Sequence, residues 1–77
     1  MSEPEKKKLI GIISPCFNEE KNVELLYTRI KEVFEGLPQY DWELTYIDNS
    51  SSDQTIEILR RLAKADKRVR AIINVRN

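Results

Sequence analysis

Histidine is absent from this 77-residue chain, and cysteine occurs once, at Cys16. Without histidine, Ser-His catalysis and the usual Cys/His zinc sites are excluded within these residues. A single cysteine forms no internal disulfide, which is typical of a protein kept in a reducing environment. We therefore expect a cytoplasmic protein with neither Ser-His catalysis nor a Cys/His zinc site among these residues.

Excess charge of either sign and long apolar runs are also missing. Thirteen Lys and Arg residues balance thirteen Asp and Glu residues, which removes the electrostatic argument for binding to nucleic acid. The apolar run at residues 9–13 is far shorter than the roughly 20 residues of a membrane span. Hydrophobic residues nevertheless make up 40% of the chain, too many for a disordered chain, so we expect one small folded domain.

Glycine is scarce, with two residues in the whole chain. No GxGxxG follows the first apolar run, and no GxxxxGK[ST] occurs, so the dinucleotide fingerprint and the P-loop are both lacking. The phosphates of any bound nucleotide would therefore be held in another way, through a metal ion.

Three apolar runs alternate with two segments in which apolar residues recur at spacings of three and four. The runs are typical of strands and the spaced segments of amphipathic helices. In chain order, the expected strands and helices cover residues 9–14, 19–36, 42–47, 56–66 and 69–75. Strand–helix–strand–helix–strand predicts an α/β fold with a three-stranded parallel sheet in the order 3-2-1. Residues 1–8 are polar and charged, and we predict a flexible tail followed by a partial domain over 9–77.

Local signals set the expected ends of these elements. Pro15 is expected to end the first strand. Asn18 or Asn22 fits the cap of the first helix, because a short polar side chain can accept a hydrogen bond from a free backbone N–H. The candidate caps of the second helix are Ser51, Ser52 and Asp53, with Ser51 and Gln54 fitting a capping box.

The order 3-2-1 places both helices on one face of the sheet and leaves the other face uncovered. Leu9, Ile10, Ile12 and Ile13 cannot all point at the helices, because side chains alternate along a strand. The first strand also carries an unpaired edge. We therefore expect that further chain covers the gap, or that the protein forms a homo-oligomer through the exposed sheet face or the first-strand edge.

Two polar loops follow the first and second strands, at residues 15–20 and 48–53. Ligands of open parallel sheets bind beyond the carboxyl ends of the strands. An aromatic ring and carboxylates meeting there would suit a nucleoside. Simpler interpretations remain: Phe17 as a core residue, Glu19 as a partner of the helix dipole, and Asp48 in an Asx-turn with the serines.

Residues 13–23 read Ile-Ser-Pro-Cys-Phe-Asn-Glu-Glu-Lys-Asn-Val, and residues 46–55 read Tyr-Ile-Asp-Asn-Ser-Ser-Ser-Asp-Gln-Thr. Together they resemble the two opening signatures of family 2 glycosyltransferases, and residues 66–77 resemble the third strand and the Arg-Asn after it. The branch is the one that makes polyprenyl-phosphate sugars, including dolichol-phosphate mannose synthases and bactoprenol glucosyltransferases. The chain departs from the second signature, commonly Val-Asp-Asp-Gly-Ser-x-Asp-Gly-Thr, at Asn49, Ser50 and Gln54.

This resemblance implies the first half of a GT-A (Rossmann-like) fold. It implies that Pro15, Phe17 and Glu19 contact the nucleoside of a UDP- or GDP-sugar and that Asp48 binds the base or ribose. Asp53 and Thr55 would shape the loop and cap the helix. Ser50 in place of glycine puts strain on the loop, because serine tolerates a positive φ less readily.

The resemblance further implies an inverting transfer of a hexose to a polyprenyl (lipid) phosphate, in a parent protein at the cytoplasmic face of a membrane. Mg²⁺ or Mn²⁺, held by an Asp-x-Asp motif beyond this sequence, would offset the charge of the leaving diphosphate. The chain alone is then expected to be inactive. Two other interpretations are a flavodoxin-like binding module without catalysis and a structural fragment that depends on oligomerisation.

Overall fold

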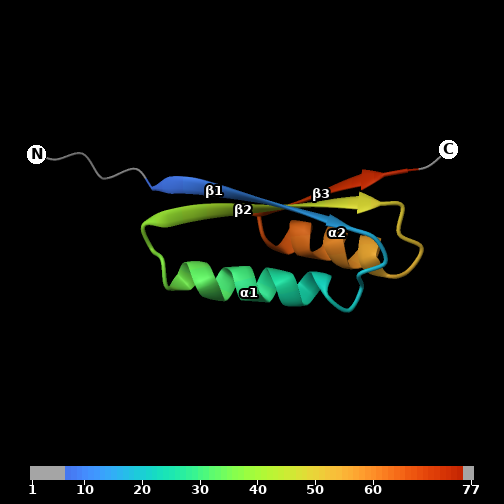
Figure 1. Cartoon of the computed structure of the whole chain (residues 1–77), viewed down its shortest axis with the longest axis horizontal. Helices are drawn as coiled ribbons and strands as arrows, with labels where there is room; N and C mark the ends of the chain where they lie inside the picture. The colour runs from blue at the N-terminus through green and yellow to red at the C-terminus, as the bar shows by residue number, and fades with distance from the viewer. Residues whose placement is uncertain (1–6, 76–77) are drawn as a thin grey trace, which may run out of the picture.

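A parallel sheet backed by two helices makes up the structure, a computed structural model that describes residues 7–75 (Figure 1). In chain order the elements are β1 (Lys8–Cys16), α1 (Val23–Glu35), β2 (Tyr40–Asn49), α2 (Thr55–Ala65) and β3 (Val69–Asn74). The strands run parallel, with β2 between β1 and β3. The predicted α/β class and the strand order 3-2-1 are therefore confirmed. Most of the predicted tail, residues 1–6, lies outside the described residues, and Lys8 already belongs to β1.

Both helices cover the same face of the sheet (Figure 1). From β2, the side chains of Trp42, Leu44 and Tyr46 point into the layer between sheet and helices and are at most 3% exposed. Leu59 from α2 is fully buried against them. Burying one such side chain stabilises the fold by about 1.5–3 kcal/mol, so this single layer is the core.

The opposite face of the sheet has no cover within residues 7–75. The parallel register aligns Pro15, Ile47 and Ile72 across the three strands, and Leu9 and Ile13 lie on the same side of β1. Leu9 is 58% exposed, Ile13 69% and Ile72 51%. We call the surface formed by these five side chains the open face. The prediction that the apolar residues of the first strand divide between two faces is confirmed.

The prediction that Pro15 ends the first strand is wrong, because β1 continues through Pro15 to Cys16. β1 is an edge strand that pairs with β2 alone. A proline has no N–H to donate, and an edge strand tolerates this where the missing donor would face away from the sheet. The strand therefore carries the chain two residues further before the loop begins.

The first helix begins at Val23, four residues later than predicted. The carbonyl of Glu19 accepts hydrogen bonds from the N–H groups of Asn22 and Val23, at 2.9 and 3.0 Å, in a turn that precedes the helix. Asn22 occupies the N-cap position but makes no capping bond with its side chain. Residues 17–22 therefore form a loop at the carboxyl end of the sheet instead of the first turn of the helix.

At the amino end of the strands, an aromatic and charged cluster closes the core. The rings of Phe34 and Trp42 stack with centroids 5.9 Å apart, and the Arg68 guanidinium lies 4.3 Å from the Trp42 ring centroid. Asp66 accepts from Arg68 Nε and Nη2 at 2.9 and 2.7 Å, and from the Tyr27 hydroxyl at 2.6 Å. This network fixes the end of the molecule that lies opposite the polar loops.

Candidate functional site

The loops that follow β1 and β2 are joined directly. Asn18 N donates to Ser51 Oγ at 2.9 Å, and Glu19 N donates to Thr55 Oγ1 at 2.9 Å. In the other direction, Ser52 N donates to Asn18 Oδ1 at 2.8 Å. The expectation that neighbouring parallel strands bring the two loops together is confirmed.

Each loop contains one residue in the left-handed backbone region. Asn18 has φ 50° and Ser50 has φ 63°, and no other non-glycine residue among those described has a positive φ. Asparagine tolerates this conformation better than serine. Ser50 does adopt it without glycine, and its hydroxyl donates to the Asn74 carbonyl at 2.6 Å. This bond from the end of β3 helps to hold the conformation that a glycine would adopt more easily.

Asp53 organises the start of α2. Its Oδ1 accepts from Thr55 N at 2.9 Å and from the Thr55 hydroxyl, and its Oδ2 accepts from Glu20 N at 3.4 Å. Desolvation opposes ionisation, yet the hydrogen bonds from Thr55 and Glu20 hold the pKa of Asp53 below its ordinary value. Of the three candidate caps, Asp53 accepts the bond from Thr55 N, whereas Gln54 occupies the N-cap position and its side chain makes no capping bond.

Asp48, predicted to bind the base or ribose, is fully buried. Its Oδ2 accepts from Ser51 N at 2.9 Å, and its Oδ1 accepts from the Ser51 hydroxyl and lies 3.9 Å from Cys16 Sγ. Burial and the nearby Asp48 charge raise the pKa of the Cys16 thiol to about 11. In this arrangement the Asp48 carboxylate shapes the loop, and its contact with a nucleotide stays a prediction.

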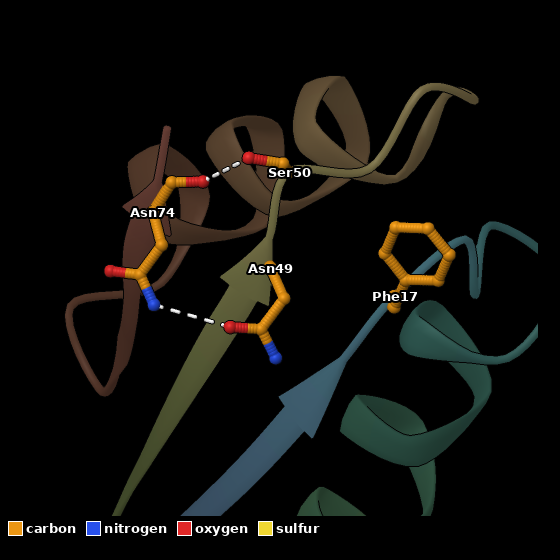
Figure 2. Close-up of a pocket in the computed structure, with 4 residues that line it drawn as sticks. All are labelled: Phe17, Asn49, Ser50 and Asn74. Atoms are coloured by element: carbon orange, nitrogen blue, oxygen red, sulfur yellow. Dashed lines mark hydrogen bonds between the residues drawn. The ribbon is translucent and has the colours of Figure 1, made fainter. Parts of the chain in front are cut away.

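Two hollows open at the carboxyl end of the sheet. The first, of about 340 Å³, is lined by Phe17, Asn49, Ser50 and Asn74 (Figure 2). Phe17 is 54% exposed there, so the interpretation of Phe17 as a core residue is wrong. The second, of about 310 Å³, is lined by residues of β1, α1 and β2: Ser14, Pro15, Cys16, Glu19, Asn22, Val23, Leu26 and Tyr46.

The four predicted site residues therefore do not share one hollow. Phe17 lines the first, Pro15 and Glu19 line the second, and Asp48 lines neither. Cys16 also lines the second hollow, and its Sγ lies 3.9 Å from the buried Asp48 carboxylate.

Asn49 and Asn74 were missed as site residues by sequence reasoning. Each is the last residue of its strand, and the two are register partners in neighbouring strands. Asn74 Nδ2 donates to Asn49 Oδ1 at 3.2 Å, and both face the first hollow across from Phe17 (Figure 2). The signal that could have found them is the alignment of strand ends, since a parallel sheet brings such residues to one edge.

Residues 7–75 hold no group of three or more His, Cys, Asp or Glu side chains placed to bind a metal ion. Neither helix in the described part of the chain has the length and apolar character needed to cross a bilayer.

The structure is an α/β sheet whose carboxyl edge carries two linked polar loops, an exposed aromatic ring and an amide pair. In open parallel sheets this is the edge at which ligands bind. The sequence model described as glycosyl transferase family 2 matches residues 11–77. The chain therefore belongs to glycosyl transferase family 2. Its described elements are those of the first half of the GT-A fold.

Three relatives illustrate the similarity. The chain is 38% identical over 72 residues to the putative glycosyltransferase CsbB of Bacillus subtilis (strain 168), covering 94% of this chain and 22% of the relative. It is 35% identical to the bactoprenol glucosyl transferase of Shigella phage SfX, covering 88% and 22%. It is 32% identical to an undecaprenyl-phosphate 4-deoxy-4-formamido-L-arabinose transferase of Yersinia enterocolitica, covering 100% and 24%. The chain thus spans about a fifth of the length of these relatives.

Proposed function

We propose that this chain is the nucleotide-binding part of a glycosyltransferase that moves a hexose from a UDP- or GDP-sugar to a polyprenyl phosphate, with inversion at the sugar carbon. Membership of glycosyl transferase family 2 supports the reaction class. The names of two relatives, a bactoprenol and an undecaprenyl-phosphate transferase, support a lipid phosphate acceptor. The observation that carries the proposal is the exposed Phe17 ring at the carboxyl edge of the sheet, facing a hollow lined by amide groups.

In this proposal, Phe17 packs against the base or ribose, as aromatic rings do on flat ligands. Pro15 and Glu19 line the adjoining hollow, where the rest of the nucleotide would extend. Asp48 would accept a hydrogen bond from a ribose hydroxyl in place of the bond that it now accepts from the Ser51 hydroxyl. Without that exchange, Asp48 acts by holding the loop that follows β2.

A divalent ion, Mg²⁺ or Mn²⁺, would offset the negative charge of the leaving diphosphate. The loop carboxylates of this chain do not fit such an ion, because Asp48 is buried and bound by Ser51, and Asp53 is bound by Thr55 and Glu20. We therefore assign no metal-dependent step to residues 7–75.

We further propose that the chain alone binds nucleotide without transferring sugar, as a segment that spans about a fifth of its relatives. We place it in the cytoplasm, with the whole protein at the cytoplasmic face of a membrane, where a polyprenyl-phosphate acceptor would lie. Incubation with labelled UDP-glucose and undecaprenyl phosphate tests the first statement, and labelled lipid product formed by the purified chain would contradict it.

A second function is favoured by the open face and the free edge of β1, which we propose as a self-association surface. An apolar sheet face and an unpaired strand edge both favour contact with another copy. This proposal is compatible with nucleotide binding at the carboxyl edge.

Calorimetric titration tests the nucleotide proposal. We expect saturable binding of UDP or GDP and no binding of NAD. Phe17→Ala should lower the affinity for the nucleotide about tenfold, because stacking on an aromatic ring contributes about 1–3 kcal/mol per base. Leu25→Ala is the matched control, because Leu25 is 50% exposed on α1 and lines neither hollow. Equal affinities for wild type and Phe17→Ala would contradict the proposed site.

A further inference from the structure

We propose that Ser51 is a positioning residue of the nucleotide site, whose hydroxyl sets the place of the Phe17 ring without touching the ligand. This inference rests on the proposed function and adds to it a residue of the second loop. Ser51 lines neither hollow, so its effect on a nucleotide at the carboxyl edge passes through Phe17.

The Phe17 ring has little support of its own. It is 54% exposed and follows the last residue of β1, in neither a helix nor a strand. Within residues 7–75 it makes no stacking or cation–π contact with another side chain. Figure 2 shows the ring extending from the chain after β1 towards the first hollow. The place of this ring therefore depends on the backbone that carries it.

The backbone next to the ring is held from the second loop. Asn18 N donates to Ser51 Oγ at 2.9 Å, and this nitrogen belongs to the peptide unit that carries the Phe17 carbonyl. Because a peptide unit is planar, a bond to its N–H restrains the orientation of the whole unit. The left-handed backbone at Asn18, with φ 50°, turns the chain immediately after it. Ser51 thus restrains the ψ angle of Phe17, and with it the direction in which the ring leaves the chain.

The Ser51 hydroxyl is itself anchored to the buried part of β2. It donates to Oδ1 of Asp48, and Ser51 N donates to Oδ2 of the same carboxylate at 2.9 Å. Asp48 is fully buried, and hydrogen bonds to a charged acceptor are stronger than those between neutral groups. Because its proton is committed to Asp48, the hydroxyl turns a lone pair to Asn18 N. An unbroken path of bonds therefore runs from the buried strand to the peptide beside Phe17.

The other bonds between the two loops do not reach this peptide. Asn18 accepts from Ser52 N at 2.8 Å through its side chain. Glu19 N donates to Thr55 Oγ1 at 2.9 Å, one residue further along the first loop. These bonds hold the loops together, whereas the Ser51 hydroxyl acts on the peptide that adjoins the ring.

This role is compatible with a nucleotide contact at Asp48. Accepting from Asn18 N uses a lone pair of the Ser51 oxygen, whereas donating to Asp48 uses its proton. A ligand hydroxyl that replaced the Ser51 proton at Asp48 would leave the bond from Asn18 N intact. Removal of the Ser51 hydroxyl separates positioning from competition, because a lost anchor for Phe17 lowers the affinity for the nucleotide and a lost competitor for Asp48 raises it.

The test is a double-mutant cycle, measured by calorimetry on the purified chain with whichever of UDP and GDP the wild type binds more tightly. Ser51→Ala should raise the dissociation constant about fivefold, in the range that couples residues of one hydrogen-bond network. In the Phe17→Ala background the same change should alter it less than about twofold, because the ring to be positioned is gone. Ser51→Thr keeps the hydroxyl and should bind as the wild type does. Ser52→Ala is the matched control, since the Ser52 hydroxyl does not contact the Phe17 peptide.

The outcomes separate the two proposals. Circular dichroism identifies the folded variants, and if Ser51→Ala does not fold, Ser51→Cys replaces it in the cycle, because sulfur is a weak acceptor for Asn18 N. An unchanged or higher affinity on loss of the hydroxyl, an equal loss in both backgrounds, or no rescue by Ser51→Thr overturns the positioning role and leaves the nucleotide site standing. Absence of binding of either nucleotide to the folded wild-type chain overturns the nucleotide site, and the positioning role with it.

Discussion

At the scale of single residues, Asn18 joins the two loops of the candidate site. Its backbone is left-handed, with φ 50°, and its Oδ1 accepts from Ser52 N and, at 3.4 Å, from Asp53 N. Asparagine is one of the few side chains that combine this conformation with a local acceptor. The geometry of the site therefore depends on this side chain even though it lines neither hollow.

Asn18→Ala should lower the free energy of unfolding by about 2 kcal/mol, because alanine disfavours a left-handed backbone and leaves two N–H groups without their acceptor. Asn18→Gly is the control, since glycine accepts the backbone and loses only the hydrogen bonds. Urea unfolding followed by circular dichroism measures both. Equal losses in the two variants would show that the left-handed conformation is not what matters.

Asp66 makes stability depend on pH. The hydrogen bonds from Arg68, against some desolvation, and the bond from Tyr27 hold the pKa of this carboxyl well below its usual range. A group with a depressed pKa in the folded state stabilises fully above its unfolded pKa, about 3.9, and loses that contribution as the pH falls towards the folded value.

Asp66→Asn should therefore lower the free energy of unfolding by about 2 kcal/mol at pH 7, the value of hydrogen bonds to a charged group. The difference from wild type should shrink below about pH 4. Asp41→Asn, at a carboxylate that is 62% exposed, should change little at either pH. A difference that stays constant from pH 7 to pH 3 would contradict the role given to Asp66.

Single residues also show which parts of the candidate site could be predicted from the sequence alone. The exposed ring of Phe17 stands at the predicted edge, because a residue after a parallel strand must lie there. The sequence analysis chose Asp48 over Asn49 for its place in the signature and its acidic side chain, because both residues end the same strand and only the pairing of the assembled sheet decides which of them is buried. The structure buries Asp48 and leaves Asn49 exposed.

At the scale of elements, α2 holds the sheet through one buried stripe. Leu59 is fully buried and Leu62 is 7% exposed, both against the sheet. A domain of this length is stabilised by roughly 4–12 kcal/mol in total. One cavity in this layer therefore removes a large part of its stability.

Leu59→Ala should destabilise the fold by about 3 kcal/mol, within the range of Leu→Ala changes in packed cores. The control is Leu25→Ala on α1, where the side chain is 50% exposed and the expected change is below about 1 kcal/mol. Chemical denaturation measures both differences. A similar loss for the two variants would show that α2 does not pack as described.

Element type and order were predictable from apolar spacing, and the bounds of α2 and β3 were predicted to within one residue, whereas the end of β1 and the start of α1 were not. The strand β1 passes through Pro15 because it lies at a sheet edge, which is a property of the assembled sheet rather than of the local sequence. Similarly, α1 begins at Val23 because Asn18 and Glu20 bond to the second loop instead of extending the helix. Contacts between distant segments thus decided both boundaries.

At the scale of the whole molecule, the open face is the largest departure from an ordinary small domain. Ile13 and Ile72 are more than half exposed on a face without helices, and contiguous apolar surface favours association. We expect concentration-dependent self-association in sedimentation experiments. Ile72→Lys should shift the chain towards monomer, while Leu25→Lys, on the opposite side of α1 from the core, should not. A wild-type monomer at all concentrations would contradict association through this face.

The central claim is that a nucleotide binds at the carboxyl edge of the sheet, beside Phe17. NMR chemical-shift mapping with UDP and GDP tests it directly, because a third hollow at the amino end, lined in part by Lys7, Trp42 and Arg68, serves as an internal comparison. The account predicts saturable shifts centred on Phe17, Asn49 and the loop after β2, with the Trp42 indole signal unmoved. Shifts centred on Trp42 and the amino end, with the loop signals unchanged, would contradict it.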